Sequence, residues 1–161
     1  MKTIVLGGGC FWCIEAVFQR VKGVDSVVSG YAGGDTVDPT YRNHGNHAEA
    51  VQVSYDPSTI NLETILEIFF GIHDPTTDGP QENTIDQGEA YRSIILCAEN
   101  EFEIVYKAKQ KAQASWNDPI ITEIKVLDTF YPAEDYHQNY FNQNESAPYC
   151  QVVINPKLKK F

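Results

Sequence analysis

The chain has 161 residues, and its hydrophobic fraction of 42% with 12% aromatic residues predicts a packed globular fold with one core. The formal net charge is -10 and no stripe of lysine or arginine is present, which argues against nucleic acid or an anionic membrane as a partner. The first residues are too poor in apolar side chains for a secretory leader, and no run is long enough to span a bilayer. We therefore expect one domain over residues 1–161, cytoplasmic, with its thiols reduced. We also expect it to be a monomer.

The spacing of apolar residues predicts alternating strands and helices along most of the chain. The expected elements are, in chain order, a strand at 3–6, a helix at 11–21, strands at 24–31 and 48–55, a helix at 61–72, a strand at 91–97, a helix at 101–116, a strand at 120–127 and a short helix near 134–141. The leading order strand-helix-strand-strand-helix-strand predicts an α+β fold with a ferredoxin-like split βαβ core, a two-layer α/β sandwich. From about residue 142 we expect an irregular, mobile C-terminal tail.

Two polar loops interrupt these elements. The first, AGGDTVDPTYRNHGNH at 32–47, is rich in turn residues. The second, HDPTTDGPQENTIDQGE at 73–89, is too long for an ordinary connection and is therefore a candidate site loop. Its opening residues, His73-Asp74-Pro75, are typical of a helix stop followed by a turn.

Cys10 lies where a glycine turn, Gly7–Gly9, passes into the first expected helix. Unpaired N–H groups at a helix N-terminus favour a thiolate, which lowers the pKa of the thiol and raises its reactivity at neutral pH. The glycines permit a tight turn and leave room for a substrate, so this position favours a reactive role over simple packing. Because adjacent helical residues cannot both face the core, at least one of Phe11 and Trp12 is expected to line a pocket.

The neighbouring cysteines carry weaker signals. Cys13 completes a Cys-x-x-Cys motif that is typical of redox pairs, but it is also a small residue within a helix, and we favour packing. Cys97 ends an apolar run and is expected to be a buried structural thiol. Separated cysteine pairs at zinc-site spacing do not occur, so we predict neither a metal nor any other bound cofactor.

Glu49 is the strongest candidate for an acid. In the strand at 48–55, alternation places it on the same face as Val51, Val53 and Tyr55. A carboxyl group on an apolar face is desolvated, which raises its pKa and keeps it protonated near neutrality. The alternative is a solvated glutamate at a sheet edge, which is the commoner position for a single carboxylate.

The motif GGGCFWC at 7–13 is followed by SGYAGG, PTY, HAEAVQVSYDP, HDPT, YRS, YPAEDYHQNYF and PYCQVVINPKL. In this order and over nearly the whole chain, these segments resemble the peptide methionine sulfoxide reductase A family. The resemblance implies an oxidoreductase that reduces the S epimer of methionine sulfoxide, free or in proteins and peptides. It also implies that thioredoxin is the reductant and a partner.

The resemblance assigns roles to particular residues. Cys10 attacks the sulfoxide sulfur and becomes a sulfenic acid, and Cys150 then forms an intramolecular disulfide with it. Glu49 supplies the acid at the sulfoxide oxygen, which also receives hydrogen bonds from Tyr41 and Tyr91.

Further residues match family positions around this set. Phe11 and Trp12 form the pocket for the S-methyl group, and Asp86 holds a water or the substrate backbone. The chain departs from the family pattern at 42–48 and 74–90, which leaves Asp78 as a substitute for Asp86. Three more family residues are expected to buttress the site: Glu134, Asp135 and His137.

Three other interpretations remain open. Cys10 and Cys13 alone suit a thiol-disulfide oxidoreductase, in which Glu49 would be dispensable. A metal-binding module would use these two cysteines with His44 and His47, although their spacing matches no standard zinc pattern. Loss of catalysis through the altered loops would leave a binding protein.

Overall fold

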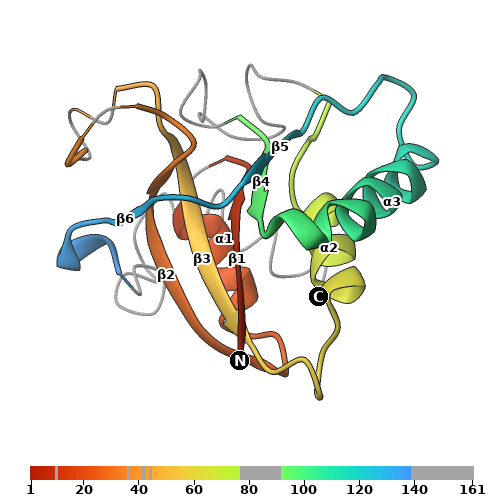
Figure 1. Cartoon of the computed structure of the whole chain (residues 1–161), viewed down its shortest axis with the longest axis horizontal. Coiled ribbons are helices and arrows are strands. Elements are labelled where there is room, and N and C mark those ends of the chain that lie inside the picture. Colours follow the sequence, from red (N-terminus) through yellow and green to blue (C-terminus); the bar gives the residue numbers. More distant parts are fainter. Residues whose placement is uncertain (10, 36, 41–42, 44, 77–91, 139–161) are drawn as a thin grey trace.

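The computed structural model describes residues 1–9, 11–35, 37–40, 43, 45–76 and 92–138 (Figure 1). The strands and longer helices are β1 (Lys2–Gly7), α1 (Phe11–Phe18), β2 (Val24–Ala32), β3 (Ala48–Tyr55), α2 (Leu62–Gly71), β4 (Ile94–Cys97), α3 (Phe102–Gln113), β5 (Glu123–Val126) and β6 (Phe130–Pro132). Two short 3-10 helices are η2 (Glu99–Glu101) and η3 (Asp135–His137).

The strands of the described residues form one sheet in the order β5-β4-β1-β3-β2-β6. β1 is antiparallel to β3 and β4, and β2 is antiparallel to β3 and β6. β4 and β5 are parallel, and α3 supplies the crossover that such a pair requires. The predicted α+β class is confirmed.

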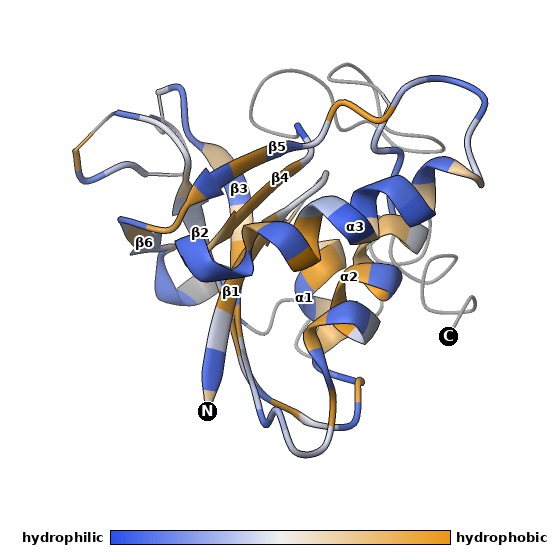
Figure 2. Ribbon diagram, turned by 45° about the vertical axis from the view of Figure 1, so that its right-hand side comes forward, coloured by the Kyte–Doolittle hydropathy of each residue, from blue (hydrophilic) through white to orange (hydrophobic). Residues whose placement is uncertain are grey.

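The helices pack on one face of this sheet, where the main core lies (Figure 1). α2 and α3 lie side by side and turn apolar residues inward, and α1 packs against β2 and β3 (Figure 2). The opposite face carries a smaller apolar cluster, covered by Leu127 and Phe130: Val5, Ala32, Ala48, Ala50, Ile94 and Leu96. Alternate residues of β3 therefore face different layers, which directs Val51, Val53 and Tyr55 toward the helices.

α2 is defined by its caps and its apolar stripe. The side chain of Asn61 accepts the Thr64 N–H at 2.8 Å, which satisfies one of the unpaired donors at the helix start. At the other end, the Ile72 N–H donates to the Phe69 carbonyl. The stripe, spaced as the sequence predicts, is buried: Leu62, Ile65, Leu66, Phe69 and Phe70.

Several expected elements differ from the structure. The strands expected at 91–97 and 120–127 are shorter, because the ladder pairs only Ile94–Cys97 with Glu123–Val126. The helix expected at 101–116 ends at Gln113, because the N–H groups of residues 114–116 bond to carbonyls three residues back. The first helix ends at Phe18 and not at residue 21, because the next N–H groups, of Arg20 and Val21, bond to carbonyls three residues back in a tighter turn. β6 lies where no strand is expected, since it gains its hydrogen bonds from the edge of β2. Of the short helix near 134–141, η3 covers 135–137, and 139–141 lie outside the described residues, as does the expected tail.

Candidate active site

Glu49 lies near the start of β3 with 1% of its surface exposed. Its Oε1 accepts the backbone N–H of Phe11 at 3.2 Å. Phe11 is the first residue of α1, and its N–H therefore has no acceptor within the helix. A buried carboxyl group thus contacts the N-terminus of α1, and this helix begins at the residue that follows Cys10 in the sequence.

The turn before α1 requires glycine. A Cβ on Gly7 would lie 2.8 Å from Cγ2 of Ile94 and 2.9 Å from the carbonyl oxygen of Glu49. Gly9 has φ of 93°, a left-handed conformation that side chains disfavour. The backbone therefore reaches the helix start pressed against β3 and β4.

Aromatic rings surround the start of α1. The ring of Phe11 lies 5.7 Å from that of Tyr31 and 5.3 Å from that of His137, measured between centroids. The Trp12 ring lies 5.5 Å from the His137 ring. Phe11 is fully buried, whereas Trp12 retains exposed surface. Of the two adjacent aromatic residues, Trp12 is thus the one that faces outward, as helical geometry requires of one of them.

His137 fixes the Trp12 indole. The indole Nε1–H donates to His137 Nδ1 at 3.1 Å, so Nδ1 is unprotonated and the neutral ring carries its proton on Nε2. Burial lowers the pKa of His137, although the nearby Glu134 carboxylate opposes this shift. The neutral acceptor is therefore the stable form at pH 7.

The segment that carries His137 is itself tied to β2. The Tyr31 hydroxyl donates to Glu134 Oε1 at 3.1 Å. The Gln138 side chain accepts the Ser29 N–H at 2.9 Å and donates to the Ser29 carbonyl at 2.8 Å. These contacts hold η3 against the sheet edge, so Trp12 has a fixed partner.

The whole chain also matches known proteins. The family model for peptide methionine sulfoxide reductase matches residues 2–161. The chain belongs to the peptide methionine sulfoxide reductase family. It is therefore an oxidoreductase of this family, and the predicted reaction, reduction of methionine sulfoxide, is confirmed at the level of the family.

Individual relatives agree over most of their length. The peptide methionine sulfoxide reductase MsrA of Leptospira borgpetersenii serovar Hardjo-bovis (strain L550) is 49% identical, and the match covers 100% of this chain and 93% of that protein. Reduced Mxr1 from Saccharomyces cerevisiae has a TM-score of 0.85 at 32% identity, covering 94% of this chain and 90% of that one. Mxr1 in complex with Trx2 has a TM-score of 0.64 at 30% identity, and the match covers 86% of this chain and 84% of that chain.

Phe11, Trp12 and Glu49 are the predicted reductase site residues that the structure brings together. The other predicted residues lie outside the described part of the chain: Cys10, Tyr41, Asp86, Tyr91 and Cys150, with the alternatives His44 and Asp78. Their roles stay predictions. The described histidine of the metal-binding alternative, His47, accepts the Gly34 N–H on its Nδ1 at 3.0 Å.

The two described cysteines are both buried in the core. Cys13 is 1% exposed on α1, in keeping with a packing role. Burial, helped by the charge of Glu101, raises the pKa of Cys97 to about 11, so this thiol stays protonated at neutral pH.

Tyr31 is a site residue that sequence reasoning did not single out. It is the second-last residue of β2 and is fully buried, and the β2–β3 register pairs it directly with Glu49. Residues paired across antiparallel strands share a face, so Tyr31 is directed toward the helix start. The signal was present in the two expected strands, because Tyr31 ends one and Glu49 is the second residue of the next.

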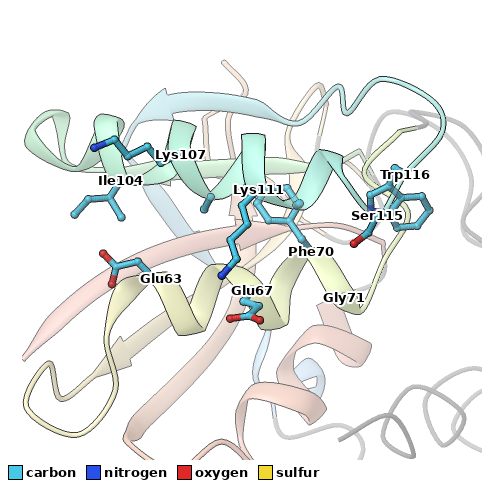
Figure 3. Close-up of a pocket in the computed structure, with 11 residues that line it drawn as sticks. Glu63, Glu67, Phe70, Gly71, Ile104, Lys107, Lys111, Ser115 and Trp116 are labelled. Carbon is cyan, nitrogen blue, oxygen red and sulfur yellow. The ribbon is translucent and has the colours of Figure 1, made fainter.

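A cavity of about 510 Å³ lies elsewhere, between α2 and α3 (Figure 3). Phe70, Ile104 and Trp116 border it with charged side chains from both helices, and it includes none of the predicted site residues. Within the described segments, no three His, Cys, Asp or Glu side chains are grouped to hold a metal, and no helix has the length and apolar character to cross a bilayer.

Proposed function

We propose that this reductase converts methionine-S-sulfoxide, protein-bound or free, to methionine, with Cys10 as the nucleophile and Glu49 as the acid. The observation that carries the proposal is the buried carboxyl group of Glu49 at the N-terminus of α1. A thiol that precedes this helix start is favoured as a thiolate, and a carboxyl group removed from water is favoured as a proton donor. The proposal thereby assigns both requirements of sulfoxide reduction to the start of α1, because Glu49 accepts the N–H of Phe11, the residue that follows Cys10 in the sequence.

The chemical step balances as a two-electron transfer. The Cys10 thiolate attacks the sulfoxide sulfur and forms a transient S–S bond while Glu49 donates a proton to the oxygen. The hydroxyl group then passes to the Cys10 sulfur, and both its bond to the substrate sulfur and the S–S bond break. The substrate sulfur is reduced by two electrons, the Cys10 sulfur is oxidised by two, and the products are methionine and a sulfenic acid. Tyr41 and Tyr91 would donate hydrogen bonds to the developing negative charge on oxygen.

Recycling uses a second thiol. The Cys150 thiolate attacks the Cys10 sulfenic acid, a disulfide forms, and water leaves. Thioredoxin, as a dithiol, then reduces that disulfide by exchange. The yeast structure of Mxr1 with Trx2 supports such a partner. The sulfoxide substrate and this external reductant are the reactants that the chemistry needs, with no bound cofactor.

The substrate pocket is proposed to use the outward face of Trp12. Its indole is held by His137, while Phe11 fills the space behind it against Tyr31. An apolar indole face suits the S-methyl group of the substrate. Asp86 would hold a water or the substrate backbone.

We also assign the core to the ferredoxin-like split βαβ fold. The strand order β4-β1-β3-β2, antiparallel throughout, supports this assignment, as does the element order from β1 to β4. A single monomeric catalytic domain in the cytoplasm remains our expectation.

The role of Glu49 is tested by Glu49→Gln, which keeps the size of the side chain and removes the transferable proton. We expect the rate of methionine formation from an S-sulfoxide peptide to fall by about a hundredfold or more, with substrate binding less affected. Single-turnover mixing with fully reduced protein measures this step without recycling.

Glu101→Gln is the matched control. Glu101 is also largely buried, and it accepts a backbone N–H, that of Ala98, at 3.2 Å beside a different helix. This variant should react at the wild-type rate. An unchanged rate in Glu49→Gln would exclude Glu49 as the acid.

A further inference from the structure

His73 lies just beyond the C-terminal end of α2 and is 7% exposed. Its Nδ1 is 2.7 Å from the Phe69 carbonyl oxygen, and its ring centroid is 4.3 Å from that of Phe69. Since a carbonyl oxygen only accepts, Nδ1 carries the proton and donates. The same carbonyl also accepts the Ile72 N–H, so the ring adds a second hydrogen bond at the end of α2, and this bond fixes the tautomer of the ring.

The other ring nitrogen continues the network. Nε2 is 2.7 Å from Ser93 Oγ, and Ser93 Oγ is 2.7 Å from Thr122 Oγ1. In the neutral ring Nε2 accepts from the Ser93 hydroxyl, which in turn accepts from Thr122. His73 thereby ties the end of α2 to the residues that immediately precede β4 and β5.

The face of the His73 ring meets the glycine turn before α1. A Cβ on Gly8 would lie 2.6 Å from Cδ2, 2.8 Å from Cγ and 2.9 Å from Nε2 of His73. Gly8 is not among the glycines with positive φ, so its backbone accepts an alanine. The three atoms nearest to such a Cβ thus all belong to the His73 ring.

The residues that contact His73 lie close in the sequence to two of the proposed site residues. Gly8 precedes Cys10 by two residues, and Ser93 follows Tyr91 by two. The Phe11 N–H, three residues after Gly8, bonds to Glu49. A shift of the turn would therefore move the nucleophile relative to its acid and to the helix N-terminus that favours its thiolate.

We propose that His73 is a positioning residue for the reductase: its ring holds the glycine turn, and its hydrogen bonds hold the start of β4. The proposal rests on the proposed function for the identity of the reacting groups. It goes beyond that function because it assigns His73 a part in the placement of Cys10, whereas the sequence of His73-Asp74-Pro75 predicts only a helix stop.

His73→Ala removes the ring and both hydrogen bonds. We expect the alkylation of Cys10 by iodoacetamide at pH 7 to slow by about tenfold, which is less than the roughly hundredfold that a displacement of about 1 Å can cost at an organised site. The midpoint of the alkylation rate against pH should move upward, because the thiol is less well placed at the helix N-terminus. Peptide mapping after quenching isolates Cys10 from the other cysteines.

Gly8→Ala tests the same contact from the other side. It should slow alkylation to a similar degree, because the new methyl group displaces the turn from the ring. The double variant Gly8→Ala with His73→Ala should be no slower than either single variant, because the methyl group then enters the space that the ring has left. Additive losses would show that His73 acts elsewhere and would overturn the proposal.

Two further variants separate positioning from stability. His73→Phe keeps a ring beside Gly8 but loses both hydrogen bonds, so its alkylation profile should lie closer to wild type than that of His73→Ala. Val105→Ala opens a cavity at a fully buried position on α3 and should destabilise the protein without moving that profile. All rates are compared at a temperature where circular dichroism shows each variant to be folded.

A wild-type alkylation profile in folded His73→Ala would overturn the proposal. Because alkylation needs no sulfoxide, the comparison is decisive even if the wild-type protein forms no methionine. A wild-type protein that forms no methionine would contradict only the proposed function.

Discussion

At the scale of single residues, the site depends on buried polar contacts. Trp12 is oriented by a histidine nitrogen that accepts a hydrogen bond, and Glu49 is removed from water beside a helix N-terminus. Protonation of His137 changes the first contact, because it removes the acceptor of the Trp12 indole. For His137 the direction of that change follows from its lowered pKa.

As the pH falls, His137 in the unfolded chain takes up a proton near pH 6.5, the ordinary pKa of histidine. In the folded chain it takes up this proton only at a lower pH. The stabilisation from neutral His137 is complete above this pH and is lost as the pH falls through the lower folded pKa. We expect the Trp12 indole to lose its acceptor in that range. Fluorescence of a Trp116→Phe protein, in which Trp12 is the remaining tryptophan, should change as the pH falls from 7, with a midpoint below 6.5.

His137→Asn is the control for this transition. Its amide oxygen is a hydrogen-bond acceptor that does not titrate, so the fluorescence should be flat over the same range. A midpoint above 6.5 in the parent protein, or an equal transition in His137→Asn, would show that another group controls Trp12.

At the scale of elements, α2 contributes one apolar face to the core and also supplies the Phe69 carbonyl to which His73 bonds. Its start depends on one side chain, since Asn61 accepts the Thr64 N–H. Asn61→Ala should lower the free energy of unfolding by about 1 kcal/mol, whereas Asn61→Asp keeps the acceptor and should cost less. Urea denaturation measures both. Equal losses would show that the cap contributes through something other than this hydrogen bond.

The sequence predicts the elements that local forces determine. The 61–72 periodicity is strong enough to place α2 within one residue at each end, and alternation in 48–55 places Glu49 on the buried face. β6 could not be predicted, because its three residues become a strand only by pairing with β2. The hydrogen bond between Trp12 and His137 could not be predicted from local sequence patterns either, since these residues lie 125 positions apart.

At the scale of the whole molecule, the sheet order assembles the site. β1 and β3 are adjacent, so the turn that follows β1 arrives beside Glu49, 38 residues from Phe11 in the sequence. β6 pairs with β2 and brings η3 to the same end of the sheet, where His137 meets Trp12. Three distant segments therefore meet around the N-terminus of α1.

The central claim is that Cys10 reduces the sulfoxide and that Cys150 recycles it. The most direct measurement mixes fully reduced protein with an S-epimer methionine sulfoxide peptide, without added reductant, and determines methionine formed per enzyme and the disulfide by mass spectrometry. A single burst of about one methionine per chain with a Cys10–Cys150 bridge is the predicted result. A Cys10–Cys13 bridge would move recycling to the start of α1, and the absence of any burst would contradict the proposed reaction.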